Sequence, residues 1–294
     1  MASSSWEGAL NCPSSSLPTS PAEAAPVRAL RNCLQHSGRY LLAVSGGLDS
    51  MVLLHGTLIL RSELSLQLAV CHVDHGVRSD TERDFSIIQN LAQRFGVETV
   101  RAHLPTCPVG ENFEGWARGQ RYQIFRNCLL HFGLDTVLTA HHQDDNLETF
   151  LMRLLSNKEL TRIQAWNPKT RSLRPFLSLG RKELSHYAKQ NNVCFNEDKT
   201  NLDPRFLRNR IRNELIPLIQ SSFGEPSVSA LIRQSAECEE LYRALDYYGS
   251  QEARALSSYA PFGSKLWLRK FQERLEELPA AAGDRLIRES FEPI

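Results

Sequence analysis

Lysine is absent from the first 157 residues of this 294-residue chain. The best-known phosphate-binding loop, G-x-x-x-x-G-K-[ST], needs a lysine after its last glycine, so a Walker-type kinase or GTPase is not expected. Cysteine pairs with C-x-x-C spacing are absent as well. The seven cysteines, at positions 12, 33, 71, 107, 128, 194 and 238, are odd in number and scattered. They predict neither a disulfide framework nor a zinc or iron–sulfur site, and they favour a reducing cytoplasm.

Long apolar runs are also missing. No stretch approaches the roughly 20 residues that span a bilayer, so we expect no membrane partner. Residues 1–27 are rich in Ser, Pro and Ala and lack a basic region followed by a continuous apolar core, so they do not predict a secretory signal. We expect a mobile tail over residues 1–27, a main domain over 28–220 and a helical region of unclear role over 221–294.

Acidic residues are scarce in one segment of the chain. Between Lys158 and Arg212, thirteen Lys and Arg stand against five Asp and Glu, although the whole chain carries a net charge of only +1. A basic segment of this kind is typical of a surface that binds a polyanion such as nucleic acid. A solvated charged surface is the alternative interpretation.

The apolar pattern of the first two thirds of the chain alternates between two periodicities. After a short helix at 27–36, apolar runs at 40–44, 66–73, 98–104 and 135–140 predict strands, and helical patterns fall at 49–61, 80–95 and 112–132. Such alternation predicts an α/β fold with a doubly wound, mostly parallel sheet. A weaker pattern continues with a strand at 173–177, a helix at 181–191 and a basic helix at 205–219. Ligands of such sheets bind beyond the carboxyl ends of the strands.

A glycine turn joins the first strand to the next helix in LLAVSGGLDSMVLLHG, residues 41–56. Gly46 and Gly47 let the backbone approach an anion closely, and the helix N-terminus behind them offers N–H groups. A phosphate would suit this turn, and a tight turn without a ligand is the alternative. The candidate phosphate-binding residues are Ser45, Gly46, Gly47, Leu48, Asp49 and Ser50.

Two further clusters contain polar residues that could face a nucleotide. CHVDHGVRSD, residues 71–80, places His72, Asp74, His75 and Arg78 at the end of the second strand. WARGQRYQIF, residues 116–125, places Arg118 and Arg121 three residues apart on one helix face, where two guanidinium groups can clamp a phosphate. Taken alone, the clusters are typical of a polar turn and of a solvated helix face.

The fourth predicted strand leads into TAHHQDDNLET, residues 139–149. Asp144 and Glu148 lie four residues apart on one helix face, with Asp145 beside them and His141 at the strand end. Together with Asp49, these carboxylates offer the oxygen ligands that Mg²⁺ prefers, and Asp49 and Asp144 are the candidate ligands. Asp144 and Asp145 could also cap the helix, and the two roles are compatible. Zinc binding through the histidines stays open.

A basic helix face follows in NEDKTNLDPRFLRNRIRNELIP, residues 196–217. Arg205, Arg208 and Arg212 are spaced i, i+3 and i+7, while apolar residues between them face the core. An arginine row of this type positions phosphates and reads little sequence itself.

Together, these motifs resemble one family. SGGLDS is similar to the pyrophosphate loop of the ATP pyrophosphatase superfamily. With HVDHGVR, ARGQRY, TAHHQDDNLET and the NEDKTN to RNRIRNELIP stretch, it follows the order and approximate spacing of the tRNA(Ile)-lysidine synthase family over residues 38–220. The resemblance implies a Rossmann-like fold of the adenine nucleotide alpha hydrolase type. It implies a cytoplasmic ligase that uses ATP and Mg²⁺ to replace the C2 oxygen of the wobble cytidine of isoleucine tRNA with the ε-amine of free lysine, through an adenylated cytidine.

The resemblance also implies roles for individual residues. Catalytic roles fall on Asp49, Arg118, Arg121, Asp145 and Glu148, of which the last two would receive the lysine ammonium. The ATP site would comprise the SGGLDS loop together with His72, Asp74 and His141. The tRNA backbone near the anticodon loop would be held by Arg205, Arg208 and Arg212.

The chain departs from the family pattern in two places. Residues 154–170 contain no glycine where the family commonly has a glycine-rich segment, and the chain is short beyond residue 220. Three rival functions stay open: a tRNA thiolation enzyme of the same superfamily, a small-molecule amidating ligase, and a tRNA-binding protein that has lost catalysis. A homodimer is also left open by the sequence.

Overall fold

The computed structural model describes residues 24–74, 81–111, 113–196, 203–261, 263–278 and 280–291. The chain divides into two units, Met1–Asn146 with Ile163–Asn209 and Leu147–Arg162 with Arg210–Ile294. Most of the predicted tail, as well as His75, Arg78 and residues 197–201 of the NEDKTN motif, lies outside the described residues. The predicted domain boundary at residue 220 stays a prediction.

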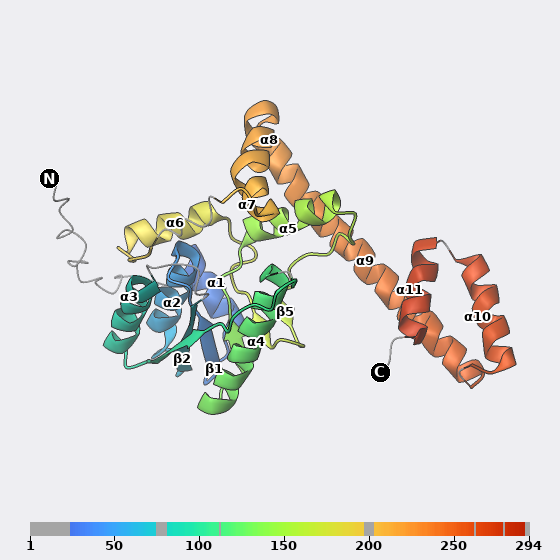
Figure 1. Cartoon of the computed structure of the whole chain (residues 1–294), viewed down its shortest axis with the longest axis horizontal. Helices are drawn as coiled ribbons and strands as arrows, with labels where there is room; N and C mark the ends of the chain where they lie inside the picture. The colour runs from blue at the N-terminus through green and yellow to red at the C-terminus, as the bar shows by residue number, and fades with distance from the viewer. Residues whose placement is uncertain are drawn as a thin grey trace. The chain divides into compact units, whose positions relative to one another are not determined.

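A six-stranded sheet forms the centre of the first unit (Figure 1). Its strands are β1 Arg39–Ala43, β2 Gln67–Asp74, β3 Glu98–His103, β4 Thr136–Leu138, β5 Trp166–Asn167 and β6 Ser172–Leu173. They are ordered β3-β2-β1-β4-β6-β5, and every neighbouring pair is parallel except β5 with β6. The predicted parallel α/β sheet is therefore confirmed. The antiparallel edge strand was not expected, and β6 covers only two residues because the chain turns away after Leu173.

Helices cover both faces of this sheet, as the alternating pattern predicts. Their bounds are α1 Ala25–Cys33, α2 Leu48–Leu60, α3 Thr81–Arg94, α4 Phe113–Phe132, α5 Gln143–Leu155, which begins in this unit, and α6 Arg181–Gln190. On one face, strand residues such as Leu42 and Val70 pack with α1, α2, α3 and α6. On the other, the alternate residues Leu41 and Ala69 pack against α4. The short Leu-, Ala- and Val-rich strands are thus buried on both sides.

The predicted basic helix at 205–219 is split in the structure. It consists of α7 Leu207–Arg210, a π-helical turn at Ile211–Leu215 and α8 Ile216–Phe223. A π-helical turn changes the phase of side chains along a helix, so the arginine spacing does not produce one continuous face.

The second unit is helical, as expected for the end of the chain (Figure 1). After α8 it contains α9 Glu225–Tyr259, α10 Lys265–Glu277 and α11 Ala280–Phe291. One apolar core joins Leu147, Phe150 and Leu151 of α5 to Ile211, and another joins Leu256 of α9 to Trp267 and Leu286. Among the described residues, no helix is both long enough and apolar enough to cross a membrane.

Candidate functional site

The turn after β1 has the geometry expected for an anion-binding loop. Gly46 has a φ of +91°, which a residue with a side chain rarely adopts. The Ser50 hydroxyl donates to the Gly47 carbonyl at 2.9 Å and accepts from the Ser45 amide at 3.2 Å, so the first turn of α2 holds the loop in shape. No side chain caps the N-terminus of α2. Its first N–H groups can therefore bind an incoming phosphate.

The loop is supported from behind by two residues that the sequence did not single out. The Asn196 amide donates to the Gly46 carbonyl at 2.9 Å, and its side chain donates to Asp84 Oδ1 at 2.7 Å. Asp84 of α3 is buried directly against the glycine. Asn196 was visible only as the first letter of the NEDKTN motif, and no spacing rule connects it with Asp84, 112 residues earlier.

Two predicted ATP-binding residues at the end of β2 are buried and already have contacts. His72 contacts the Val44 carbonyl through Nδ1 at 2.9 Å, so Nδ1 carries the proton and donates, and Nε2 is left as a buried acceptor without a hydrogen bond. Asp74 lies 2.9 Å from Arg101 and 3.4 Å from His103. His72 therefore lies against Val44, the residue that precedes the loop, whereas the Asp74 carboxylate already contacts Arg101 and His103 of β3.

Three predicted acids meet around a buried histidine. His142 lies 3.2 Å from Asp144, 3.6 Å from Asp49 and 3.5 Å from Asp145. Burial alone would lower the pKa of His142, but the carboxylates of Asp144 and Asp49 and the charge of Asp145 outweigh it and raise the pKa to about 10. The Arg181 amide, at the start of α6, donates to Asp144 at 2.8 Å, a contact that the sequence did not predict.

This acidic cluster fits a magnesium ion that is shared with a phosphate ligand. Asp49 Oδ1 is buried and has no hydrogen-bond partner, so it can accept a cation. Among the described residues, no group of three or more His, Cys, Asp or Glu side chains is arranged to hold a metal by itself. Mg²⁺ commonly takes only one or two protein carboxylates and completes its shell with phosphate oxygens and water. Asp49 and Asp144 suit a Mg²⁺ ion that takes two protein carboxylates and completes its shell with phosphate oxygens and water.

Asp145 has two structural roles. It accepts a hydrogen bond from the His142 backbone at 2.9 Å, which caps α5 as the sequence suggested, and it lies 2.5 Å from Arg208. Although burial raises the pKa of Asp145, the charges of His142 and Arg208 outweigh it, and the pKa is lowered. The carboxylate is thus held ionised.

A second cluster is strongly basic. Arg118 and Arg121 both lie over the Tyr122 ring, at 5.3 and 5.9 Å from its centroid. Arg174, which follows β6, donates to the Tyr122 hydroxyl at 3.4 Å and to the Gln164 carbonyl at 2.6 Å. Burial, together with the neighbouring guanidinium groups, lowers the pKa of Arg121. The predicted clamp therefore contains a third arginine that the sequence did not predict.

His141 lies beside this basic cluster, with Nδ1 at 3.0 Å from the Thr139 hydroxyl. Its pKa falls to about 3, first because of burial and then because Arg174, Arg208 and Arg121 are near, although Asp145 acts in the opposite direction. A neutral imidazole at this position can exchange hydrogen bonds with a nucleotide.

The three arginines of the predicted tRNA face lie in different surroundings. Arg205 is 85% exposed and pairs with Asp203 at 2.7 Å. Arg208 is engaged with Asp145, as described above. In the second unit, Arg212 forms a two-pronged ion pair with the buried Glu148, at 2.5 and 2.9 Å. Of the three, only Arg205 presents its guanidinium largely to solvent.

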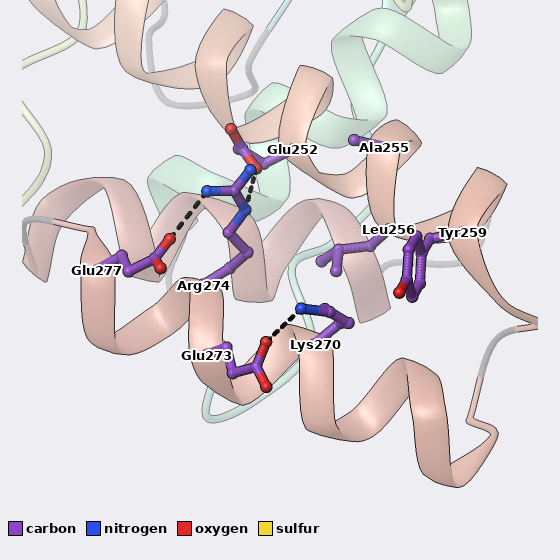
Figure 2. Close-up of a pocket in the computed structure, with 8 residues that line it drawn as sticks. All are labelled: Glu252, Ala255, Leu256, Tyr259, Lys270, Glu273, Arg274 and Glu277. Atoms are coloured by element: carbon purple, nitrogen blue, oxygen red, sulfur yellow. Dashed lines mark hydrogen bonds and ion pairs between the residues drawn. The ribbon is translucent and has the colours of Figure 1, made fainter.

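The second unit has a cavity of its own, of about 370 Å³, between α9 and α10 (Figure 2). Arg274 pairs with Glu252 and Glu277, and Lys270 pairs with Glu273. Figure 2 shows Arg274 between Glu252 and Glu277, and Lys270 beside Glu273. Both cations of the lining are paired with carboxylates, and its three glutamates outnumber the two cations, so the cavity lacks the excess positive charge of the arginine cluster.

The chain is similar in sequence to a known family. Residues 22–219 match a family model described as a PP-loop domain. A tRNA(Ile)-lysidine synthase from Nostoc sp. is 32% identical over 283 residues, which cover 90% of this chain and 80% of that protein. A tRNA(Ile)-lysidine synthase from Protochlamydia amoebophila is 33% identical over 68% of this chain. The chain spans only 45% of the length of that relative.

A solved structure shares the fold. The U34-tRNA thiolase NcsA from Methanococcus maripaludis, solved with its [4Fe-4S] cluster, has a TM-score of 0.59. It is 14% identical and covers 73% of this chain and 78% of its own. At this identity the likeness supports the arrangement of strands and helices and nothing finer.

Proposed function

We propose that this chain, which belongs to the PP-loop family of tRNA(Ile)-lysidine synthases, uses ATP to ligate free lysine to C2 of the wobble cytidine of isoleucine tRNA. One observation carries the proposal. In the first unit, the phosphate loop follows the carboxyl end of β1, the acids around Asp49 begin α2 and α5, and Arg174 of the basic cluster follows the carboxyl end of β6. That edge is where ligands of such sheets bind.

The loop at Ser45–Ser50 would hold the pyrophosphate part of ATP through its backbone N–H groups. Asp49 and Asp144 would hold Mg²⁺, which supplies positive charge against the phosphate oxygens. His142 would keep both carboxylates in place, since it contacts each of them. His72 and the neutral His141 would complete the nucleotide site.

The reaction needs two displacements because the C2 oxygen of cytidine is a poor leaving group. First, this oxygen attacks the α-phosphorus of ATP, and pyrophosphate leaves. Then the lysine ε-amine attacks C2, and AMP leaves with the oxygen. Arg118 and Arg121 would stabilise the charge on the phosphoryl group in both steps, because guanidinium groups form strong charge-assisted hydrogen bonds with phosphate.

The attacking amine must lose a proton before it can act as a nucleophile. Asp145 is held ionised and would receive the lysine ammonium and help remove its proton. The sequence pattern gives the same role to Glu148, one helical turn later in α5. Arg208, which contacts Asp145, would hold the acid in place until lysine arrives.

The tRNA would be bound through its backbone. The anticodon loop is single-stranded, so the wobble base can enter a site without a duplex being opened. Arg205 would contact phosphates, and the resemblance implies the same role for Arg208 and Arg212. The cytoplasm stays our expectation for the place of the reaction, although Cys194 is disulfide-bonded in the structure, which the scattered cysteines did not predict.

Pyrophosphate release tests the proposal directly. Purified protein would be incubated with ATP, Mg²⁺ and an isoleucine tRNA transcript that carries a wobble cytidine, with and without labelled lysine. We expect release that depends on this tRNA, with label incorporated into the RNA. Release without incorporation would indicate another nucleophile, such as the sulfur donor of a thiolation enzyme. No release, with tRNA still bound, would indicate a protein that has lost catalysis.

A further inference from the structure

Arg174 is a buried cation without an acidic partner in the part of the chain that the structure describes. Its side chain is 3% exposed, and its hydrogen bonds go to the Gln164 carbonyl and the Tyr122 hydroxyl. Its Nε is buried with no hydrogen-bond partner. A buried charge is costly unless it is paired, because it loses its water without gaining an opposite charge.

The surroundings of Arg174 add positive charge and do not neutralise it. Arg121 and Arg118 flank the same Tyr122 ring, and the pKa of Arg121 is lowered by burial and by its neighbours. The neighbouring His141 is acted on by the carboxylate of Asp145, but Arg208 already holds that carboxylate at 2.5 Å. The basic cluster of Arg118, Arg121 and Arg174 therefore has more cations than anions.

Arg174 lies at the functional edge of the sheet. Leu173 ends β6, which runs parallel to β4, and the Leu173 carbonyl accepts a hydrogen bond from the Thr139 amide at 3.1 Å. Arg174 therefore follows β6 just where Thr139 and His141 follow β4. The carboxyl ends of two neighbouring strands thus deliver His141 and Arg174 to one place.

We infer that Arg174 binds a phosphate group of the bound nucleotide, the one that becomes AMP in the reaction proposed above. This inference rests on the proposed function for the identity of the nucleotide. The observation that supports phosphate binding itself is the buried Arg174 guanidinium without a compensating acid. A nucleotide phosphate carries the negative charge that the surroundings of Arg174 do not supply. Arg174 is then a phosphate-binding residue, and the Tyr122 hydroxyl orients it.

A purely structural role explains less. The bond to Gln164 and the backbone bond from Arg174 to Ala165 join the chain after β6 to the chain before β5, but a neutral donor would serve as well. A guanidinium ion adds a desolvation cost that only an anion offsets.

The test measures binding of AMP and of inorganic phosphate to the full chain by thermal shift and calorimetry. The variants are Arg174→Gln, which keeps a donor but removes the charge, and Arg174→Lys, which keeps the charge. The control is Arg39→Gln, an exposed arginine paired with Asp135 at the amino edge of the same sheet. We expect Arg174→Gln to bind AMP about 10- to 100-fold more weakly, because a charge-assisted hydrogen bond is lost. Arg174→Lys should recover part of the affinity, and Arg39→Gln should bind like the unmodified chain.

Two outcomes would overturn the inference. One is an unchanged AMP affinity in folded Arg174→Gln. The other is a loss of tRNA affinity in the absence of nucleotide, with AMP affinity unchanged, which would assign the anion to the RNA backbone. Failure of the proposed function gives a different result: the unmodified chain would incorporate no lysine, while the AMP affinities of the variants would still decide the role of Arg174.

Discussion

Arg208 contacts Asp145 at 2.5 Å, so an arginine expected to face RNA is bound to an acid expected to face lysine. Asp145 is buried, and it also accepts the backbone N–H of His142. The pair therefore links the chain after the sheet to the start of α5 within the first unit. It suggests that Arg208 maintains the charge and position of a reacting acid.

Arg208→Gln should destabilise the fold. The substitution leaves the Asp145 carboxylate buried without its closest cation, and removing one partner of such a pair costs about 1–3 kcal/mol or more. Urea unfolding at pH 7 measures the loss. Arg205→Gln is the matched control, because Arg205 is exposed and its surface pair contributes little. Equal stability of the two variants would contradict the structural role of the Arg208 pair.

Arg205→Gln should act on RNA binding instead. An exposed arginine that contacts a phosphate releases a counterion, so its removal weakens tRNA binding about equally for all sequences and reduces the salt slope by about one. Filter binding of tRNA at several salt concentrations measures both. If the slope matched that of the unmodified chain, Arg205 would lie outside the RNA interface.

Gly46→Ala should weaken ATP binding while the protein still folds. A Cβ at Gly46 would lie 2.9 Å from the Cβ of Asp84, and the φ of +91° is itself unfavourable for alanine. The loop would therefore have to move, and its N–H groups would no longer point at one phosphate. Equilibrium dialysis with ATP measures the effect, which we expect to exceed tenfold.

Gly110→Ala separates the two causes. Gly110 has nearly the same φ, +90°, but a Cβ there would meet no atom within 4 Å. This variant should carry a similar backbone strain and bind ATP normally. Loss of ATP binding in Gly110→Ala as well would mean that strain, and not displacement of the loop, explains the result at Gly46.

The sequence predicted the sheet and the loop because both depend on local patterns. Apolar strands and a Ser-Gly-Gly turn before a helix leave few alternatives, and β1, α2 and β2 lie within two residues of their expected bounds. The acids of TAHHQDDNLET also met Asp49, since ends of parallel strands share one edge. These residues could be placed together without any knowledge of side-chain packing.

Other parts of the site depend on long-range packing, and the sequence did not predict them. Asp84 and Asn196 meet behind Gly46 although 112 residues separate them. The sequence predicted a strand at 173–177, but β6 ends at Leu173, so Arg174 follows the strand and does not lie within it. The arginine row was expected on one helix face, but a π-helical turn at Ile211–Leu215 interrupts that helix. A change of helical phase is not visible in residue spacing.

Asp49→Ala should abolish pyrophosphate release with little change in tRNA binding. The substitution removes an oxygen with no hydrogen-bond partner that faces the proposed Mg²⁺ site, whereas the basic segment is untouched. Release assays over a Mg²⁺ series, with tRNA binding measured in parallel, test this. Asp135→Ala, which removes an exposed acid at the other edge of the sheet, is the control. An active Asp49→Ala variant would show that the loop assignment is wrong.

Acidification should weaken the fold through a histidine outside the site. His55 of α2 is buried and contacts the Tyr187 hydroxyl at 2.8 Å. Burial, aided by the charge of Arg94, lowers its pKa to about 4 from a usual value near 6.5. Because the unfolded chain binds this proton more readily, the contribution to stability is complete above pH 6.5 and is lost as the pH falls toward 4. Between pH 7 and pH 5 the loss should be about 2 kcal/mol.

Urea unfolding at both pH values, compared between the unmodified chain and His55→Gln, isolates the contribution of His55 to the free energy of unfolding, since the variant lacks the titrating group and keeps all others. Equal pH slopes for the two proteins would show that His55 takes up its proton as easily when folded as when unfolded.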